Sequence, residues 1–513
     1  MLLDYEEVGV GVHTPVSFVT STVCLGLGDE GNLGACKILT RPSGTCEDRQ
    51  CGGTLVGPVA AMTHVCRSCG CNAHNAICNR HGARAPPVSR DFSEFISEFE
   101  RMEEELAATY HMHLEAYGSN WIERWPQSKR DAIHASVAID PIEPDKVKCM
   151  VKREVGPKVP SKARCIQFYP NLATQAEFAP ETASLQKAIC GTFYRREFGL
   201  AKITFSSGLN AATLGQWADD ALKDYDNPYF YERDGKNWDA TMGEVHHRLK
   251  MRVYKMAGDE YVRFMDKSSV VKGFGVFQNE VMRYKLHFTT KSGHNDTTLG
   301  NNIVNAAITW SCFLGRRVDI LVGGDDLFVI VEGDFDEHEI ARKEREYGIK
   351  PEYRKFRSIE DSSYISGLFA VTDQGIKFIA KPGRLLSCLF WTVKPPSTRP
   401  DKLRAYQRGV AKGVLPTMQD VPVVGPWLRN IGDEGDTIKD RSRRCYTYGI
   451  EVHADFKPWF DRRYGLSKSD VDEANELLAK AGASRCIVRC HALDVIKAVD
   501  YADIEDREEG GDY

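Results

Sequence analysis

The chain of 513 residues is predicted to adopt an α+β fold, and three observations lead to this class. Two apolar runs within residues 320–331 flank Gly-Gly-Asp-Asp, which predicts two antiparallel strands joined by a tight turn. Apolar residues recur at helical spacing over residues 91–110, which predicts an amphipathic helix. The composition, 42% apolar and 27% charged, is that of a soluble globular protein with a large core.

Composition also argues against several classes of protein. No run reaches the roughly 18 apolar residues that span a bilayer, and the N-terminus lacks the basic start of a signal peptide. We therefore expect a reducing, intracellular environment. The formal net charge is -5, so binding of nucleic acid must use local basic tracts rather than a cationic surface as a whole.

Residues 1–90 form a cysteine-rich region, because eight of the sixteen cysteines lie before residue 80. In a cytosolic protein such clustering indicates metal binding before disulfides. Two sets of ligands suit the tetrahedral preference of zinc: Cys46, Cys51, Cys66 and Cys69, and Cys71, His74, Cys78 and His81. A group of free buried thiols is the alternative, and the spacing leaves it open.

Residues 148–167 form a basic tract with six Lys or Arg residues against one acid. β-forming residues alternate with these cations, and glycine and proline interrupt them, which predicts two strands joined by a loop. Cations at this density suit phosphate, and the forked arginine side chain matches phosphate oxygens. The alternative is a generic surface patch.

The Gly-Gly-Asp-Asp turn is the centre of the functional prediction. Gly323 and Gly324 permit the positive φ angles of a tight hairpin. Asp325 and Asp326 then stand at its tip, where two carboxylates repel each other unless a cation holds them. An aromatic segment further upstream predicts a strand that ends near Asp234, whose carboxylate would face the hairpin acids. The alternative is an ordinary hairpin with a polar turn.

A Gly-containing loop at residues 291–296 precedes apolar residues at helical spacing, which predicts a loop feeding a buried helix. Hydroxyls and amides at the mouth of this helix suit a sugar or a backbone phosphate. The same residue types are preferred as helix caps, so a purely structural role stays open. Further helices are predicted over residues 209–223, 336–347 and 467–481, and a further hairpin turn at 373–375.

In their order along the chain, these segments resemble the sequence motifs of viral RNA-dependent RNA polymerases of positive-strand RNA viruses, with tombusviruses and nodaviruses as the nearest neighbourhood. The matching segments are Lys152-x-Glu154 with Lys162-x-Arg164 (motif F), Asp234-x4-Asp239 (motif A), Ser292 to Asn301 (motif B) and Gly323 to Asp326 (motif C). The resemblance spans residues 148–395, and residues 1–90 resemble no known family.

The resemblance implies a right-hand polymerase fold with fingers, an antiparallel-sheet palm and a mostly helical thumb. The implied divisions are a cysteine-rich region at 1–90, fingers at 91–226, a palm at 227–394 with a fingers insertion at 257–290, and a thumb with an acidic tail at 395–513. The tail, residues 503–513, carries six acids and one arginine, which predicts disorder.

The resemblance also implies two-metal catalysis of nucleotidyl transfer. Asp234 and Asp325 would hold two Mg2+ or Mn2+ ions, with Asp326 in support. The incoming triphosphate would be bound by Lys152, Lys162 and Arg164. One ion would activate the RNA 3′-hydroxyl, and the other would neutralise the leaving pyrophosphate.

Further residues are implied for sugar selection and proton transfer. The ribose 2′-hydroxyl would be read by Asp239, Ser292 and Asn301. Thr297 would brace that network, and Lys355 would protonate the leaving pyrophosphate, with Lys350 as the alternative donor.

The implied partners are template and product RNA, ribonucleoside triphosphates and other viral replication proteins. The implied location is the host cytoplasm, at membrane-associated replication complexes reached through those partners. Two alternatives remain: a reverse transcriptase, which the Gly-Gly-Asp-Asp turn and the ribose-reading residues disfavour, and a catalytically silent RNA-binding scaffold, which the complete set of metal-binding acids disfavours.

Overall fold

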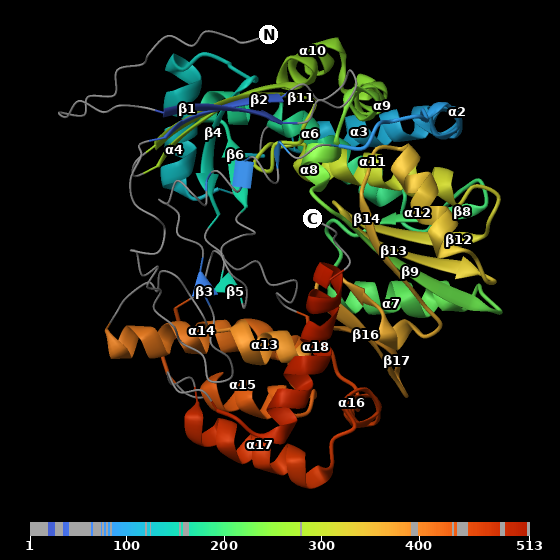
Figure 1. Ribbon diagram of the computed structural model, residues 1–513, viewed down its shortest axis with the longest axis vertical. Helices are drawn as coiled ribbons and strands as arrows, with labels where there is room; N and C mark the ends of the chain where they lie inside the picture. The colour runs from blue at the N-terminus through green and yellow to red at the C-terminus, as the bar shows by residue number, and fades with distance from the viewer. Residues whose placement is uncertain are drawn as a thin grey trace.

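The computed structural model describes most of the chain from residue 85 onward. The described ranges are 85–117, 121–123, 125–152, 155–156, 164–277, 280–390, 399–432, 435–438, 450–482 and 488–509, preceded by 19–25, 34–40, 63–64, 73, 76–77 and 81–82. These residues form a mixed α+β structure with two large sheets and a separate group of helices (Figure 1).

The predicted hairpin lies within a six-stranded sheet of order β14-β9-β13-β12-β8-β7. Neighbouring strands are antiparallel except β12 and β8, which run parallel. Its strands are β7 (Arg196–Phe198), β8 (Ala201–Phe205), β9 (Pro228–Gly235), β12 (Val318–Gly323), β13 (Asp326–Glu332) and β14 (Pro351–Phe356). Because β7 and β8 lie in this sheet, they belong with the hairpin rather than with the preceding region, to which the sequence assigned them.

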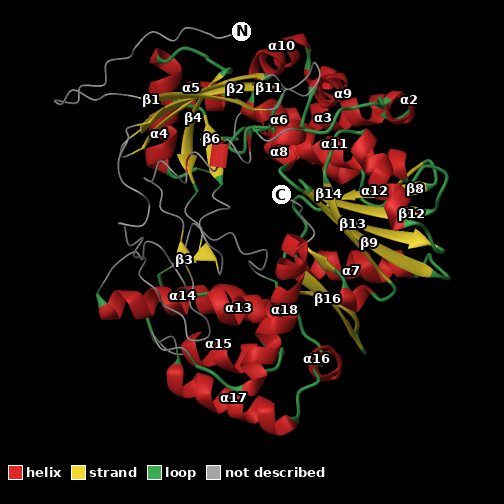
Figure 2. Ribbon diagram, viewed as in Figure 1, coloured by secondary structure: helices red, strands yellow, loops and turns green. Residues whose placement is uncertain are grey.

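Helices cover both faces of the hairpin sheet (Figure 2). On one face lie α11 (Thr297–Cys312) and α12 (Glu337–Glu346), and on the other lies α7 (Ala211–Leu222). Alternate hairpin residues divide between two cores, so that Ile320 joins the α11 side and Leu321 the α7 side. A sheet buried on both faces explains why its strands read as uninterrupted apolar runs.

The second six-stranded sheet has the order β1-β2-β11-β10-β4-β6. It combines the basic tract, β4 (Lys146–Val151) and β6 (Cys165–Phe168), with the insertion strands β10 (Val270–Phe277) and β11 (Glu280–His287). The cysteine-rich region completes it with β1 (Val19–Leu25) and β2 (Gly34–Thr40), a pairing that the sequence did not predict. A two-stranded pair, β3 (Thr63–His64) with β5 (Val155–Gly156), also joins this region to the tract.

Helices surround these sheets in the order of the chain. They are α2 (Ser93–Glu100), α3 (Glu103–Tyr117), α4 (Gln127–Ile139), α5 (Leu172–Ala176), α6 (Ala179–Thr192), α8 (Trp238–Thr241), α9 (Glu244–Tyr254) and α10 (Asp259–Ser268). The helix predicted over residues 91–110 is divided into α2 and α3 by a tighter turn, in which the amide of Met102 bonds to the carbonyl of Phe99 at 2.9 Å. The predicted apolar face stays buried across the break.

The C-terminal part follows a small sheet of β15 (Ser363–Tyr364), β16 (Gly367–Thr372) and β17 (Gly375–Ala380). It consists of α13 (Pro382–Cys388), α14 (Pro400–Met418), α15 (Val424–Gly432), α16 (Lys457–Tyr464), α17 (Lys468–Ala481) and α18 (His491–Glu509), with no strand among the residues described there. None of the described helices combines the length and hydropathy needed to cross a bilayer.

The prediction of a disordered acidic tail is wrong for residues 503–509, because α18 runs through Glu509. Its first turns are anchored in the core by Leu493 and Ile496. A helix that has already formed adds residues at low cost, and glutamate is a good helix former, so the acidic residues extend it.

Candidate active site

The hairpin turn consists of two residues, Gly324 and Asp325, between the paired Gly323 and Asp326. Gly324 has a φ of 72°, and it is the first turn residue, as a type II′ hairpin requires. Gly323 does not have a positive φ, contrary to the prediction. It is needed for close packing instead, since a Cβ there would lie 2.5 Å from the hydroxyl of Tyr364.

The structure brings the three predicted metal-binding acids to one end of the sheet. Strand β13 pairs with β9 through Leu327 and Arg233, so the same register one residue further places Asp326 opposite Asp234. Neighbouring strands lie about 5 Å apart, and residues opposite each other point to the same face. All three acids are partly exposed. Within the described residues, no three His, Cys, Asp or Glu side chains already converge as a ligand set.

Two asparagines of α11 hold the turn, and the sequence analysis assigned them no role. The side-chain oxygen of Asn302 accepts the amide of Gly324 at 2.6 Å. The side-chain NH2 of Asn305 donates to the carbonyls of Gly324 at 3.0 Å and Asp326 at 3.3 Å. Both asparagines are fully buried. Two amides inside an otherwise apolar helix were the signal that could have identified them.

A buried ion pair lies behind the carboxylates. Arg233, adjacent to Asp234, pairs with Glu344 of α12 at 3.1 Å, and both side chains have 0% exposure. The same guanidinium donates to the carbonyl of Asp325 at 3.3 Å and to the side-chain oxygen of Asn305 at 2.6 Å. The hydroxyl of Tyr231 donates to the second oxygen of Glu344 at 2.9 Å. This network fixes the backbone of the acidic turn against β9 and α12.

The basic tract forms the two strands that the sequence predicts. Beyond their last pair, the amide of Lys152 donates to the carbonyl of Arg164 at 2.7 Å. These two cationic side chains are therefore neighbours at the same end of the second sheet, and both are exposed. Lys162 lies outside the described residues.

The loop before α11 is tied to the basic tract. The Ser292 hydroxyl accepts the amide of Gln167 at 3.2 Å and donates to the carbonyl of Cys165 at 3.2 Å. Gly293 permits this approach, because a Cβ there would lie 2.4 Å from the carbonyl of Gln167. The Thr297 hydroxyl closes the loop by donating to the carbonyl of Lys291 at 2.6 Å. In this structure, Ser292 and Thr297 thus position the loop.

A buried charge cluster lies beneath the same loop. Asp296 pairs with His294 at 2.5 Å and Lys250 at 3.4 Å, and it accepts the hydroxyl of Tyr254 at 3.0 Å. Burial alone would raise the pKa of Asp296, but the neighbouring cations hold it well below its ordinary value. Burial lowers the pKa of Lys291 to about 7, although Asp296 opposes this shift. Its ammonium donates to the carbonyl of Ser268 at the end of α10, where a cation is favourable.

The two ribose-reading residues come from different helices. Asp239 lies in α8 and is partly exposed, and Asn301 lies near the start of α11 with 6% exposure. Their sequence separation hides this proximity, which the segment between β11 and α11 establishes through the backbone of Asp239.

The two lysines considered as proton donors lie at opposite ends of β14. Lys355 pairs with Tyr231, three residues and about 10 Å along β9 from Asp234. It forms ion pairs with Asp334 at 2.5 Å and Glu337 at 3.3 Å. Burial opposes its charge, but these acids raise the pKa of Lys355 above its ordinary value.

Lys350 lies at the end of β14 that is nearer the carboxylates. Its carbonyl accepts the amide of Lys236 at 2.9 Å, just beyond the pairing of Pro351 with Gly235. Since Asp234 directly precedes Gly235, position alone favours Lys350 over Lys355 as a neighbour of the site.

Of the eight predicted zinc ligands, only His81 falls within the described residues. Its ring is buried, and Nε2 donates to the carbonyl of Cys165 at 3.2 Å. In a neutral imidazole this leaves the lone pair on Nδ1, the state in which histidine binds zinc. The other ligands lie outside the described residues, so the zinc prediction stays a prediction.

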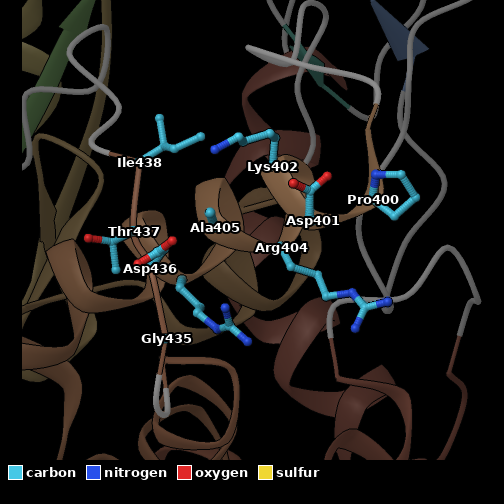
Figure 3. A pocket seen from close by; sticks show the side chains of 10 residues that line it. Pro400, Asp401, Lys402, Arg404, Ala405, Gly435, Asp436, Thr437 and Ile438 are labelled. Atoms are coloured by element: carbon cyan, nitrogen blue, oxygen red, sulfur yellow. The ribbon is translucent and has the colours of Figure 1, made fainter.

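A large cavity lies in the helical part, away from the hairpin. It has a volume of about 980 Å³ and lies between the start of α14 and residues 435–438 (Figure 3). Its charged lining residues are Asp401, Lys402, Arg404, Arg408 and Asp436. The cavity carries both signs of charge and shares no residue with the predicted site.

Comparisons with known proteins bear directly on this region. Residues 87–389, more than half of the chain, match a family model described as RNA dependent RNA polymerase. The RNA-directed RNA polymerase of Melon necrotic spot virus is 29% identical over 134 residues, which cover 25% of this chain and 17% of that relative. The resemblance inferred from the four motifs is confirmed.

Proposed function

The chain belongs to the RNA-dependent RNA polymerase family, and on this premise we propose that it replicates a viral RNA genome by template-directed synthesis. The observation that carries the proposal is the strand register, which sets Asp234 beside Asp326 with Asp325 in the adjoining turn. Three oxygen-donor side chains at one sheet end suit hard divalent cations such as Mg2+ or Mn2+.

The proposed reaction is an in-line displacement. The 3′-hydroxyl oxygen of the growing RNA bonds to the α-phosphorus of a ribonucleoside triphosphate, and the bond from that phosphorus to the bridging oxygen of the β-phosphate breaks. Pyrophosphate leaves. Two ions bound by Asp234 and Asp325, with Asp326 in support, would activate the hydroxyl and neutralise the phosphates. Arg233 and the α11 asparagines keep these acids in register.

The remaining substrate groups have proposed partners on either side of the carboxylates. Lys152 and Arg164 bind the triphosphate, together with Lys162. Asp239 and Asn301 read the ribose 2′-hydroxyl, which distinguishes RNA precursors from DNA precursors. Ser292 and Thr297 support them by fixing the intervening loop to the basic tract.

For the proton that pyrophosphate takes up on leaving, we propose Lys350 as the donor in place of Lys355. Lys355 lies about 10 Å along the sheet from Asp234, and its raised pKa disfavours release of a proton.

In the right-hand description, we propose the hairpin sheet as palm, the sheet of the basic tract and insertion as fingers, and the helices from α13 onward as thumb. The strands β7 and β8 then move the start of the palm to about residue 196. The cysteine-rich region would contribute to the fingers through β1 and β2, with zinc as its proposed ligand.

The proposed partners are RNA, ribonucleoside triphosphates and other viral replication proteins. Those proteins would bring the chain to membrane-associated replication complexes in the host cytoplasm.

The test is a template-directed extension assay with Mg2+ or Mn2+, run with and without a primer. We expect Asp325→Asn to abolish ribonucleotide incorporation while RNA binding persists. Asp220→Asn, which changes an exposed acid on α7, serves as the matched control and should keep full activity. Incorporation by Asp325→Asn at the wild-type rate would refute the metal-binding role. An inactive wild-type chain that still binds RNA would favour the silent scaffold.

A further inference from the structure

The segment between β11 and α11 links the two residues proposed to read the ribose. Thr290 lies in this segment with 5% exposure. Its amide donates to the carbonyl of Asp239 at 3.0 Å, and its hydroxyl donates to the side-chain oxygen of Asn301 at 3.3 Å. One residue therefore contacts both partners, which belong to helices far apart in the chain.

The side-chain contact sets the orientation of the Asn301 amide. Because its oxygen accepts the Thr290 hydroxyl, the NH2 end of the amide is the end directed elsewhere. A ribose 2′-hydroxyl can donate to the carboxylate of Asp239 and accept from this NH2 group at the same time. A deoxyribose can do neither, and a polar group that loses its partner costs binding free energy.

We propose that Thr290 is a positioning residue for sugar selection, which holds Asn301 in the orientation that recognises ribose. This inference rests on the proposed polymerase function. Thr290 does not contact the sugar in this account. It acts through Asn301, while its backbone bond to Asp239 keeps the two reading residues together.

The neighbouring Thr289 offers a matched control. It has the same side chain in the same segment and is 7% exposed. Its hydroxyl is buried and has no hydrogen-bond partner among the residues that the structure describes. Valine replaces threonine with the same shape, so Thr289→Val and Thr290→Val remove one buried hydroxyl each and differ only in whether that hydroxyl bonds to Asn301.

The experiment compares kcat/KM for a ribonucleotide and for its 2′-deoxy analogue in the full chain. For Thr290→Val we expect the ratio of the two values to fall about five-fold, the equivalent of roughly 1 kcal/mol for one neutral hydrogen bond. The ribonucleotide should account for the fall, because the deoxy sugar does not use the Asn301 amide. Thr290→Ser should keep the wild-type ratio, as should Thr289→Val.

A wild-type ratio in Thr290→Val would overturn the inference, as would equal losses in Thr289→Val or equal losses with both nucleotides. If Thr290→Val does not fold, Thr290→Ala and Thr290→Ser decide, because both lack the methyl group and only the serine keeps the hydroxyl. Equal ratios in that pair overturn the inference. A wild-type chain that incorporates ribonucleotides selectively, combined with an unselective role for Thr290, sinks the inference alone. A wild-type chain that incorporates neither nucleotide overturns the proposed function as well.

Discussion

The buried pair of Arg233 and Glu344 should contribute to stability and to the position of the acidic turn in separable ways. Glu344→Gln removes the negative charge and leaves the guanidinium buried without a counter-charge. Since both side chains have 0% exposure, loss of one partner should lower the local free energy of unfolding by about 3–5 kcal/mol. The amide that replaces one carboxylate oxygen also faces a donor, either Arg233 or Tyr231.

The double replacement Arg233→Met with Glu344→Leu removes both charges, so most of the stability should return. Polymerase activity should stay low, because the carbonyl of Asp325 and the side chain of Asn305 have lost their donor. A chain of this length need not unfold in one step, so the measurement is hydrogen exchange of the amides in β9 and α12. The two variants are compared with wild type and with Glu476→Gln, which breaks an exposed pair in α17 and should change nothing measurable.

Two results would contradict this account. A change below about 1 kcal/mol in Glu344→Gln would mean that the buried charge is compensated in another way. A double variant as unstable as the single variant would mean that the loss comes from packing rather than from the uncompensated charge.

Three further predictions concern pH, proton donation and zinc. Burial lowers the pKa of His246 to about 4 while its Nε2 donates to the carbonyl of Tyr347, so the folded state holds the ring neutral. Its contribution is fully present above pH 6.5 and is lost as the pH falls towards 4, by about 3 kcal/mol in all; denaturation at several pH values should show a flatter dependence in His246→Gln, and equal slopes would disprove it. Lys350→Leu should lower kcat by about 10²-fold and Lys355→Leu by less than about tenfold in single-turnover extension, and the reverse order would restore Lys355 as the donor. Elemental analysis of the full chain should find at least one zinc, which Cys66→Ser with Cys69→Ser should reduce; metal-free wild-type protein that is folded and active ends that prediction.

Local sequence patterns predicted most of the elements that surround the site. The hairpin, the strand ending at Asp234, the helix after the 291–296 loop and the capped α17 all follow from signals confined to a few neighbouring residues. Such signals arise from backbone geometry and from the spacing of apolar residues, which depend little on the rest of the chain. Prediction failed where an element is extended by its neighbours, as in the acidic end of α18.

Contacts between distant segments could not be predicted in this way. Arg233 and Glu344 are 111 positions apart, and nothing in either local pattern indicates that both are buried together. The same holds for Ser292, whose hydroxyl bonds to β6 across 125 positions. The place of Lys355 depends on the register of β14 against β9, which no local signal sets.

The sequence alone determined which chemical groups this protein has and in what order: the acids, the basic tract, and the loop with its hydroxyls and amides. These are covalent facts, and their order was enough to indicate the family. The tertiary structure decided which of these groups meet, because register and helix packing bring Asp326 opposite Asp234 and place Thr290 between Asp239 and Asn301. Side chains hundreds of atoms apart along the chain act together only when the buried core fixes the distance between their backbones.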